Sequence, residues 1–500
     1  GLKGDKLNEP NPSEYQDNKV DKHSDDEVPS IAIIPFENKG ADEDVFYAYG
    51  ISVDLISDCS SAGLIRVASL KDIENLDYNN LNTSKIANNL SVRYISTGSL
   101  WKMGELFQLS IEIYDAKEEK VIWSDRWQEK WDILPSIKNN LSDGLLKTLN
   151  IKPRFEEKVE TANPEAYEFY LRGNVKWKKR KNKDDIEIAR KLYRKAIEID
   201  GNLFRAINHL AFSYQVLGDF NEAMKLYKSS LKKAEQNEDK VYIAGSLRGI
   251  GMVYSGLEKY EEHFKYVNKS RKIFQDIGDN YGIAITTHDI GNYYSEKGDF
   301  EEAINCYQQA LSIYKELDEI GYVTLITLGF CYHHIGKLDK ALENFRYLQK
   351  YYLNEENMFR LSIVYGSIGQ IYLDKGNFNN SIEYLEKSND IVNEIGSHPG
   401  AKLRVSSYLY LARKKAGLKF NKINLQNLIK ENYDYWNERG TRTFEDSELP
   451  FVLYQLLEEI TYLQTAYSQI QEKANNLEPD VKAKFLSYPI PKAIVEEWEK

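Results

Sequence analysis

The sequence offers few groupings of residues that could catalyse a reaction or hold a metal. His333 and His334 are adjacent, and adjacent side chains on a helix point about 100° apart, so this pair cannot comfortably chelate one metal. No two cysteines stand at the spacing of a zinc-binding pair, and no segment has the Gly-x-x-x-x-Gly-Lys-Ser/Thr order of a phosphate-binding loop. We therefore expect no catalytic residue, no metal and no cofactor in this chain.

Three other groupings have simple structural explanations. Gly249-Ile250-Gly251 has the spacing that opens a dinucleotide-binding loop, but it falls inside a helical pattern and no strand precedes it. The acidic pairs Glu301-Glu302 and Glu355-Glu356 stand at helix starts, where carboxylates complement the helix dipole. A basic cluster from Lys176 to Lys183 is typical of a solvated helix end. We therefore expect a binding function rather than an enzymatic one.

Length and composition narrow the expected class of protein. With 500 residues the chain is too long for one compact core, and its net charge of −11 argues against nucleic acid as a direct partner. Cys59, Cys306 and Cys331 lie in apolar helix patterns, which indicates reduced core thiols and a cytoplasmic location. No segment approaches the roughly 18 apolar residues of a membrane span. Because the chain opens with Gly1 rather than Met, we expect it to belong to a longer or processed protein.

A fixed pattern recurs five times in the middle of the chain and predicts its architecture. A small residue is followed three positions later by Tyr, and twelve positions after the first by a second, usually small, residue. The tyrosines stand 40, 40, 38 and 40 residues apart. A constant period of this size is typical of a helical solenoid, whose units bury their apolar faces by stacking on one another. The five copies are Ala211/Tyr214/Ala223, Gly251/Tyr254/His263, Gly291/Tyr294/Ala303, Gly329/Tyr332/Ala341 and Gly369/Tyr372/Ser381.

The pattern has a direct physical interpretation. The two small residues lie on successive helices and let the backbones approach, while the Tyr fills the space between helices. Turns such as Gly218-Asp219-Phe220 end one helix with Gly and start the next with an aromatic residue. This combination closely resembles the tetratricopeptide repeat, and an earlier copy is visible at Ala189/Tyr193/Ala196. The chain departs from that family because the closing proline is missing from every copy and most units run to 40 residues rather than about 34. In this it is similar to the long repeats of bacterial regulators and peptide-binding adaptors.

Four regions are expected along the chain. Residues 1–29 carry few large apolar side chains and are expected to form a disordered linker. Residues 30–150 combine short apolar runs, a helical pattern and the alternation from Phe107 to Ile113, which predicts an α/β domain with a small mixed sheet. Residues 163–417 are expected to form an all-α solenoid of about six repeats. Residues 418–500 are expected to form a helical cap that hides the last face of the solenoid from water.

The region before the repeats resembles a second family. Ser30-Ile-Ala-Ile-Ile-Pro-Phe-Glu-Asn38, Phe46-Tyr-Ala-Tyr-Gly-Ile51 and Val92-Arg-Tyr-Ile-Ser-Thr-Gly-Ser99 resemble the TolB amino-terminal-like domain. The junction Asn163–Gly173 is similar to that of bacterial fusions of this domain with tetratricopeptide repeats. The resemblance implies that the pair sits carboxy-terminal to an effector, which is a class III adenylate or guanylate cyclase, a winged-helix DNA-binding domain or a protein kinase. The closing stretch Lys484–Trp498 is most similar to the cyclase-linked members.

These resemblances imply a sensory or regulatory module that binds a protein or peptide and controls a signalling effector. A nucleotide cyclase acting in cyclic AMP signalling is the leading effector. The alternatives are the regulatory half of a winged-helix transcription regulator and a free-standing scaffold. Any cyclase activity, and a homodimer formed through the effector, would reside upstream of Gly1.

The resemblance to tetratricopeptide repeats also implies a groove, because variable positions on the first helix of each pair line the concave face of such solenoids. Asn and Arg side chains there can clamp the backbone of an extended peptide, while small apolar pockets select side chains. The expected groove residues are Asn208, Arg248, His288, Asn292 and Gln370.

Overall fold

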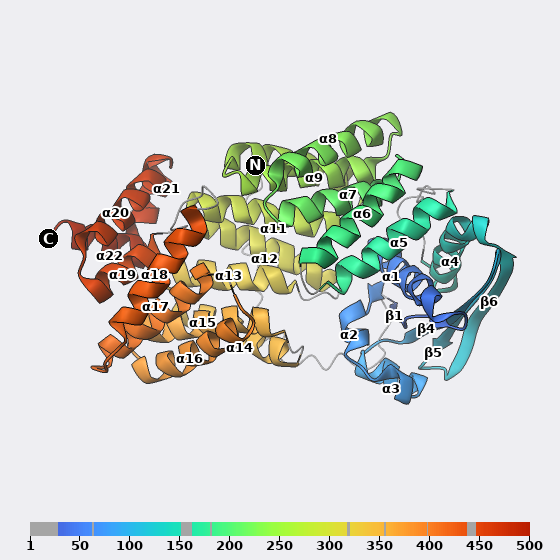
Figure 1. The fold of residues 1–500 in the computed structure, drawn as a ribbon, viewed down its shortest axis with the longest axis horizontal. Helices are drawn as coiled ribbons and strands as arrows, with labels where there is room; N and C mark the ends of the chain where they lie inside the picture. The colour runs from blue at the N-terminus through green and yellow to red at the C-terminus, as the bar shows by residue number, and fades with distance from the viewer. Residues whose placement is uncertain are drawn as a thin grey trace. The chain divides into compact units, whose positions relative to one another are not determined.

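The protein forms two compact units (Figure 1). The amino-terminal unit holds the described residues up to Asp289 together with a short segment that starts at Ile313. The carboxy-terminal unit holds Ile290–Ser312 and the described residues from Gly321 onward. Apart from Pro29, the expected linker over residues 1–29 lies outside the described residues. The computed structural model describes residues 29–62, 65–151, 163–180, 183–317, 321–354, 357–397, 399–437 and 447–500.

A mixed six-stranded sheet opens the amino-terminal unit. Its strand order is β3-β1-β4-β5-β6, and β2 follows β1 along the same edge of β4. The pairs of β1 with β3 and of β1 and β2 with β4 are parallel, whereas β4, β5 and β6 form an antiparallel meander. The strands are β1 (Ser30–Ile33), β2 (Glu37–Asn38), β3 (Arg66–Val67), β4 (Tyr94–Met103), β5 (Leu106–Asp115) and β6 (Lys120–Lys130).

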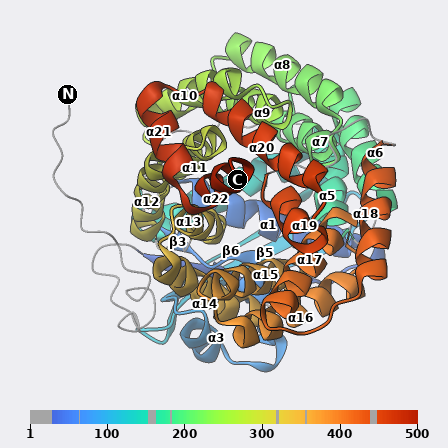
Figure 2. The same ribbon diagram turned by 90° about the vertical axis from the view of Figure 1, so that its left-hand side faces the viewer.

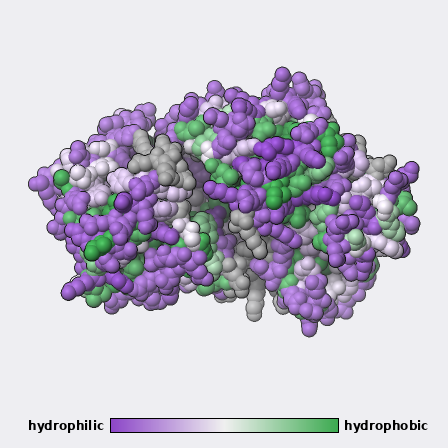
Figure 3. Space-filling view, viewed as in Figure 1, coloured by the Kyte–Doolittle hydropathy of each residue, from purple (hydrophilic) through white to green (hydrophobic). Residues whose placement is uncertain are grey.

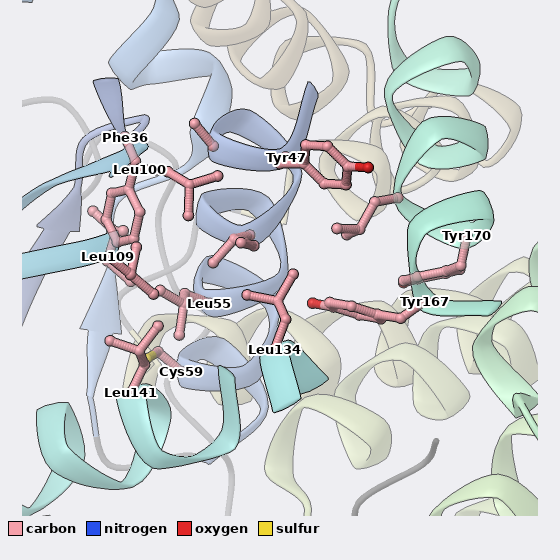
Figure 4. Close-up of a cluster of buried hydrophobic side chains, with 14 of the residues drawn as sticks. Phe36, Tyr47, Leu55, Cys59, Leu100, Leu109, Leu134, Leu141, Tyr167 and Tyr170 are labelled. Atoms are coloured by element: carbon pink, nitrogen blue, oxygen red, sulfur yellow. The ribbon is translucent and has the colours of Figure 1, made fainter. Parts of the chain in front are cut away.

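Helices cover both faces of this sheet. The alternating apolar residues of β5 pack with α1 (Val45–Ala62) and α4 (Leu134–Thr148), while α2 (Leu70–Glu74) and α3 (Thr83–Asn89) lie with a smaller core on the other face. Figure 4 shows Leu100 and Leu109 of the sheet on one side of α1, and Tyr167 and Tyr170 on the other. These tyrosines belong to the first helix of the repeats. One core, therefore, joins the sheet, α1 and the start of the solenoid.

From residue 164 to the end, the described chain is helical, so the fold class predicted from the sequence is confirmed. Most of these helices form antiparallel pairs, and within each unit the first helix of several pairs contacts the second helix of the pair before it. The amino-terminal unit contains α5 (Pro164–Lys178), α6 (Lys183–Ile199), α7 (Phe204–Val216), α8 (Phe220–Gln236), α9 (Lys240–Gly256), α10 (Tyr260–Ile277) and the first half of α11 (Asn280–Lys297). The carboxy-terminal unit continues with α12 (Phe300–Glu316, mostly in this unit), α13 (Tyr322–His334), α14 (Leu338–Asn354), α15 (Met358–Asp374), α16 (Phe378–Glu394), α17 (Pro399–Lys415), α18 (Lys422–Asn437), α19 (Glu448–Leu457), α20 (Ile460–Asn475), α21 (Pro479–Ser487) and α22 (Pro489–Trp498).

The repeat glycines are explained by one recurring contact. In the four copies that begin with Gly, this residue packs against the side chain sixteen positions later, on the second helix of the pair. A Cβ added to Gly291 would lie 2.6 Å from the ring of Tyr307, and one added to Gly369 would lie 2.6 Å from Leu385. Such distances leave no room for a methyl group, so Gly lets these helices approach. Gly251 with Val267 and Gly329 with Phe345 repeat the contact.

The repeat alanines are buried where the two helices of a pair meet. Ala223, Ala303 and Ala341 stand in the first turn of α8, α12 and α14, and each is fully buried. Ala211 on α7 is also fully buried, and it shares one apolar cluster with Ala223. These four side chains are closed to a ligand, so the structure gives them a packing role and no place on a binding surface.

Two copies carry a polar residue at the second position, and each polar side chain has a partner. His263 and Ser381 are both buried. Ser381 Oγ donates to the carbonyl oxygen of Gly369 at 2.8 Å, and His263 Nδ1 lies 2.9 Å from the carbonyl oxygen of Gly251. Each side chain thus bonds the first small residue of its own copy, which compensates for placing a polar group at this position.

The hydroxyls of several repeat tyrosines join one helix pair to the next. Gln308 Nε2 on α12 donates to Tyr332 Oη on α13 at 3.2 Å, and Arg346 Nη2 on α14 donates to Tyr372 Oη on α15 at 2.6 Å. Arg194 on α6 makes the same kind of bond to Tyr214 on α7. These hydroxyls therefore have partners within the solenoid and are unavailable as primary ligand contacts.

The five repeat tyrosines are not equally enclosed. Tyr332 and Tyr372 are buried, whereas Tyr214, Tyr254 and Tyr294 are only half-buried. The ring of Tyr254 stacks on that of Tyr266, on the second helix of its own pair, with 5.4 Å between the ring centres. The ring of Tyr294 meets its neighbour Tyr293 edge to face at 5.2 Å. The sequence pattern fixes where these rings stand, but neighbouring side chains decide how far each is covered.

The last helices of the carboxy-terminal unit fold back onto earlier turns of that unit (Figure 2). α18 and α19 pack on α17, whereas α21 and α22 reach the turns that follow α11 and α13. Phe485 lies against Gly298, Pro489 lies against Gly336, and Lys484 Nζ lies 2.8 Å from Glu301 Oε2. These helices, therefore, tie the end of the chain to residues almost two hundred positions earlier.

Candidate binding surface on the first helices

The five expected groove residues occupy two positions, each of which recurs from one repeat to another. Asn208, Arg248 and His288 each stand three residues before the first small residue of a copy, on α7, α9 and α11. Asn292 and Gln370 each follow that small residue directly, on α11 and α15. The first three belong to the amino-terminal unit and the other two to the carboxy-terminal unit. Each unit is therefore described as a separate candidate surface.

Arg248 forms an ion pair across two first helices. Its Nε donates to Asp289 Oδ2 at 2.6 Å and its Nη2 donates to Oδ1 at 3.3 Å. The side chain of Arg248 is 30% exposed, whereas that of Asp289 is 2% exposed. Burial lowers the pKa of Arg248, but the carboxylate of Asp289 outweighs this effect and raises it above its usual value. The guanidinium has five N–H groups, so part of it remains available for a ligand.

Two of the expected residues are more enclosed than the sequence suggests. His288 is buried rather than exposed, and burial lowers its pKa, so the imidazole is neutral at pH 7. Asn292 is half-buried, and its Oδ1 accepts a hydrogen bond from Tyr307 Oη at 2.7 Å. Gln370 is half-buried on α15.

Among the five expected residues, Asn208 is the one with a buried polar atom that lacks a hydrogen-bond partner among the described residues. The residue is half-buried beside α9, where a Cβ added to Gly245 would lie 4.0 Å from its Nδ2. Its Oδ1 is buried and, among the described residues, has no hydrogen-bond partner. An unpaired buried acceptor costs about 1–3 kcal/mol, so it calls for a donor from water or a ligand.

The same face of α7 also presents apolar side chains. Phe212 and Val216 follow Asn208 at steps of four residues, which places all three on one side of the helix, and both are exposed. The ring of Trp177, from the last turn of α5, meets Phe212 edge to face at 5.9 Å. Figure 3 shows hydrophobic side chains gathered over α6 and α7 on the visible face. This surface combines the unpaired amide oxygen of Asn208 with an apolar strip.

A buried polar junction connects this surface to the α/β region. It consists of Arg205 and Tyr167 with Asp54 and Asp58 of α1, and it was not predicted from the sequence. Arg205 on α7 donates to Asp58 Oδ1 on α1 at 2.8 Å and to Tyr242 Oη on α9 at 3.2 Å. Tyr167 Oη on α5 donates to Asp54 Oδ2 at 2.7 Å, and burial followed by the charge of Asp54 raises the pKa of Tyr167. The signal was available, because Asp54 and Asp58 stand one helical turn apart in a mostly apolar helix.

Beside the junction, His209 packs against the rings of Tyr170 and Tyr193. Its Nδ1 and Tyr193 Oη both contact Asn174 Oδ1, at 2.5 and 2.9 Å. Burial, and then the charges of Arg205 and Lys178, lower the pKa of His209 to about 4. The imidazole is therefore neutral at pH 7 and donates its Nδ1–H to the amide oxygen.

Comparison with protein families identifies the type of repeat. Models of the tetratricopeptide repeat match residues 204–237, 242–316 and 363–391. The chain carries tetratricopeptide repeats. Four of the five copies found in the sequence lie within the matched segments, so that prediction is confirmed. A tetratricopeptide fold supports a protein or peptide as the partner.

Among curated proteins, "Putative adenylate cyclase 3" of Rhizobium meliloti is 25% identical over 198 residues. The match covers 38% of this chain and 33% of that protein, so it spans about a third of the relative's length. A Rap protein complexed with competence and sporulation factor is 16% identical, with a TM-score of 0.38, over 56% of this chain and 81% of the other. TolB from Acinetobacter baumannii is 18% identical, with a TM-score of 0.21, over 25% of this chain and 29% of the other. The TolB-like domain expected over residues 30–150 remains a prediction.

Two further observations concern the whole described chain. Among the described residues, no helix is both long and apolar enough to cross a membrane. Within the same residues, no group of three or more His, Cys, Asp and Glu side chains is placed to hold a metal ion.

Proposed function

We propose that this chain is a regulatory module whose repeats bind an extended peptide or protein segment and thereby control a nucleotide cyclase, either fused to it or associated with it. Residues 30–150 form the TolB-like part in this proposal, residues 163–417 the binding solenoid and residues 418–500 its cap. The module acts in the cytoplasm, and a homodimer forms through the effector. Direct binding of nucleic acid is not part of the proposed role.

The unpaired acceptor of Asn208 carries the binding half of the proposal. Rotation about the last torsion of this half-buried side chain presents its amide to the groove, where a peptide N–H supplies the missing donor. Phe212 and Val216, one and two turns further along α7, offer apolar surface to a side chain of the same peptide. Arg248 adds N–H groups for peptide carbonyls on the next repeat.

The effector half of the proposal is supported by the resemblance of the closing stretch to cyclase-linked proteins and by the curated relative from Rhizobium meliloti. We assign the cyclase to a separate region and not to these residues, because the sequence offers no grouping of catalytic residues. The purified chain is expected to make no cyclic AMP from ATP. Production of cyclic AMP by residues 1–500 would refute the assignment of the cyclase to a separate region.

The binding half is tested with peptides selected from a displayed library on the full chain. Asn208→Ala and Phe212→Asp should each weaken a selected peptide by about tenfold, which corresponds to about 1.4 kcal/mol. Lys228→Ala, an exposed substitution on the second helix α8, is the control and should leave the affinity unchanged. Failure to select any peptide, or peptides whose affinity survives both substitutions, would count against this surface.

A further inference from the structure

The amino-terminal unit also contains a cleft that shares no residue with the proposed groove. A cleft of about 610 Å³ is bounded by the start of α1, β4, α5 and α6. Its lining residues include none of the residues proposed for the peptide groove. Pockets of about 300–1,000 Å³ at the junction between two structural regions are typical of small-molecule sites. The volume limits the size of a ligand, and the side chains that line the cleft determine its chemistry.

One wall of the cleft is apolar. Phe46 of α1, Val175 of α5, and Ile188 with Leu192 of α6 contribute to it. Ile188 is 43% exposed, which leaves a large aliphatic side chain in contact with water inside a concave site. Covering this surface with an apolar group of a ligand removes it from water, which favours binding.

Cations on the other walls are held in place by aromatic rings. The guanidinium of Arg172 lies 4.4 Å from the centre of the Phe46 ring, and Nη2 of Arg172 contacts Glu168 Oε1 at 2.6 Å. Nζ of Lys102 lies 4.5 and 4.8 Å from the ring centres of Tyr47 and Trp131 and donates to Tyr47 Oη at 3.0 Å. A ring attracts the charge without occupying an N–H group in a conventional hydrogen bond. These cations, therefore, keep donors for a ligand.

One cation of the lining is left for an anion. Lys102, Arg172, Lys176 and Lys179 line the cleft together with two carboxylates, Glu43 and Asp44, and Arg172 is paired with Glu168 outside the lining. Lys179 lies 4.4 Å over the ring of Tyr49 and has no carboxylate partner among the described residues. Lys176 and Lys102 are partly neutralised, by Asp185 at 2.6 Å and by Asp44 at 3.5 Å. Lys179 is therefore the cation of this cleft that is left to attract the anionic group of a ligand.

We propose that this cleft binds a small organic anion with an aromatic or aliphatic body. The body lies against Phe46 and Ile188, and the carboxylate, sulfonate or phosphate group accepts hydrogen bonds from Arg172 and Lys179. Because the cleft joins α1 to α5 and α6, an occupant contacts the α/β region and the first repeat at once. The site thus gives the module a small-molecule input in addition to peptide binding.

Anilinonaphthalene sulfonate has both features, an aromatic body and one anionic group, and its fluorescence rises in apolar sites. Titration into the full chain should show one saturable site. Ile188→Trp fills the cleft and should weaken binding at least about tenfold. Lys179→Glu should weaken it about three- to tenfold at low salt, with a smaller effect at about 0.5 M salt, where charges are screened.

Matched controls separate the cleft from general surface binding. Ile423→Trp changes an exposed apolar residue on α18, and Lys228→Glu reverses an exposed charge on α8; neither should alter the affinity. No saturable binding by the folded wild-type chain, or a dissociation constant unchanged by Ile188→Trp, would overturn the site. Loss of binding in Ile188→Trp with unchanged affinity in Lys179→Glu would overturn the anionic part of the proposal.

Discussion

The chain provides two ion pairs with the same shortest nitrogen–oxygen distance and different burial, which allows a direct test of what the Arg248–Asp289 pair contributes. In both pairs the shortest nitrogen–oxygen distance is 2.6 Å. Asp289 is 2% exposed, whereas Arg413 and Glu386, which join α17 to α16, are 35% and 46% exposed. Replacing each arginine by Met keeps most of the aliphatic stem and removes the charge.

We expect the two substitutions to lower the free energy of unfolding by amounts that differ several-fold. Removing one partner of a fully buried pair costs about 3–5 kcal/mol, because the other charge stays buried without compensation. Arg248 is 30% exposed, so water can partly solvate the site, and we expect about 2 kcal/mol for Arg248→Met. With a denaturant slope of about 3 kcal/mol per M, the urea midpoint of the amino-terminal unit should fall by about 0.7 M. For Arg413→Met we expect less than about 0.5 kcal/mol.

Urea unfolding followed by circular dichroism measures the midpoints, and hydrogen exchange of α9 and α11 locates the change. A double-mutant cycle with Asp289→Asn isolates the coupling, which should be about 1.5 kcal/mol or more. If Arg248→Met shifts the midpoint no further than Arg413→Met does, burial does not control the strength of this pair and the reasoning is refuted.

Three further predictions concern packing and pH. Gly291→Ala should destabilise the carboxy-terminal unit by about 1–3 kcal/mol, measured by urea unfolding, because the methyl group meets the ring of Tyr307; an unchanged midpoint would contradict the packing rule. His209, with its pKa lowered to about 4, takes up a proton more readily when unfolded. The stability of its unit should therefore be full above about pH 6.5 and fall towards pH 4, and His209→Gln should flatten this slope. His333 behaves in the opposite way: burial lowers its pKa, but the hydrogen bond and charge of Asp374 outweigh burial and raise it. Its contribution should be present below pH 6.5 and lost as pH rises through the raised pKa, a trend that His333→Gln should abolish if the assignment is correct.

The features that could be predicted from the sequence are those that repeat or alternate. The forty-residue period specifies stacked helix pairs, and the alternation in β5 specifies a sheet with one buried face. The short helix α2 was missed because five residues carry no measurable period. The division of the chain at Ile290, within α11, was not expected either.

The expected groove residues could be given from the sequence only as a set of positions. Equivalence between copies places Asn208, Arg248 and His288 on first helices, but it does not reveal their partners. Asp289 is 41 positions from Arg248, and Asp58 is 147 positions from Arg205, so these ion pairs depend on how whole helices stack. A period in the sequence fixes which helices are neighbours, whereas side-chain pairing across them follows from packing.

The contacts of α21 and α22 with the turns at Gly298 and Gly336 have a kinetic consequence. An ordinary repeat array has only neighbour contacts, so it can fray from its free end one unit at a time. Here Lys484 and Phe485 connect the last helices to the first turns of the carboxy-terminal unit, which closes a loop of about 180 residues. We expect such a closed array to unfold in one cooperative step and to fold slowly, because the closing contacts have a high sequence separation. Deleting α21 and α22 would restore a free end and turn that single step into gradual unravelling.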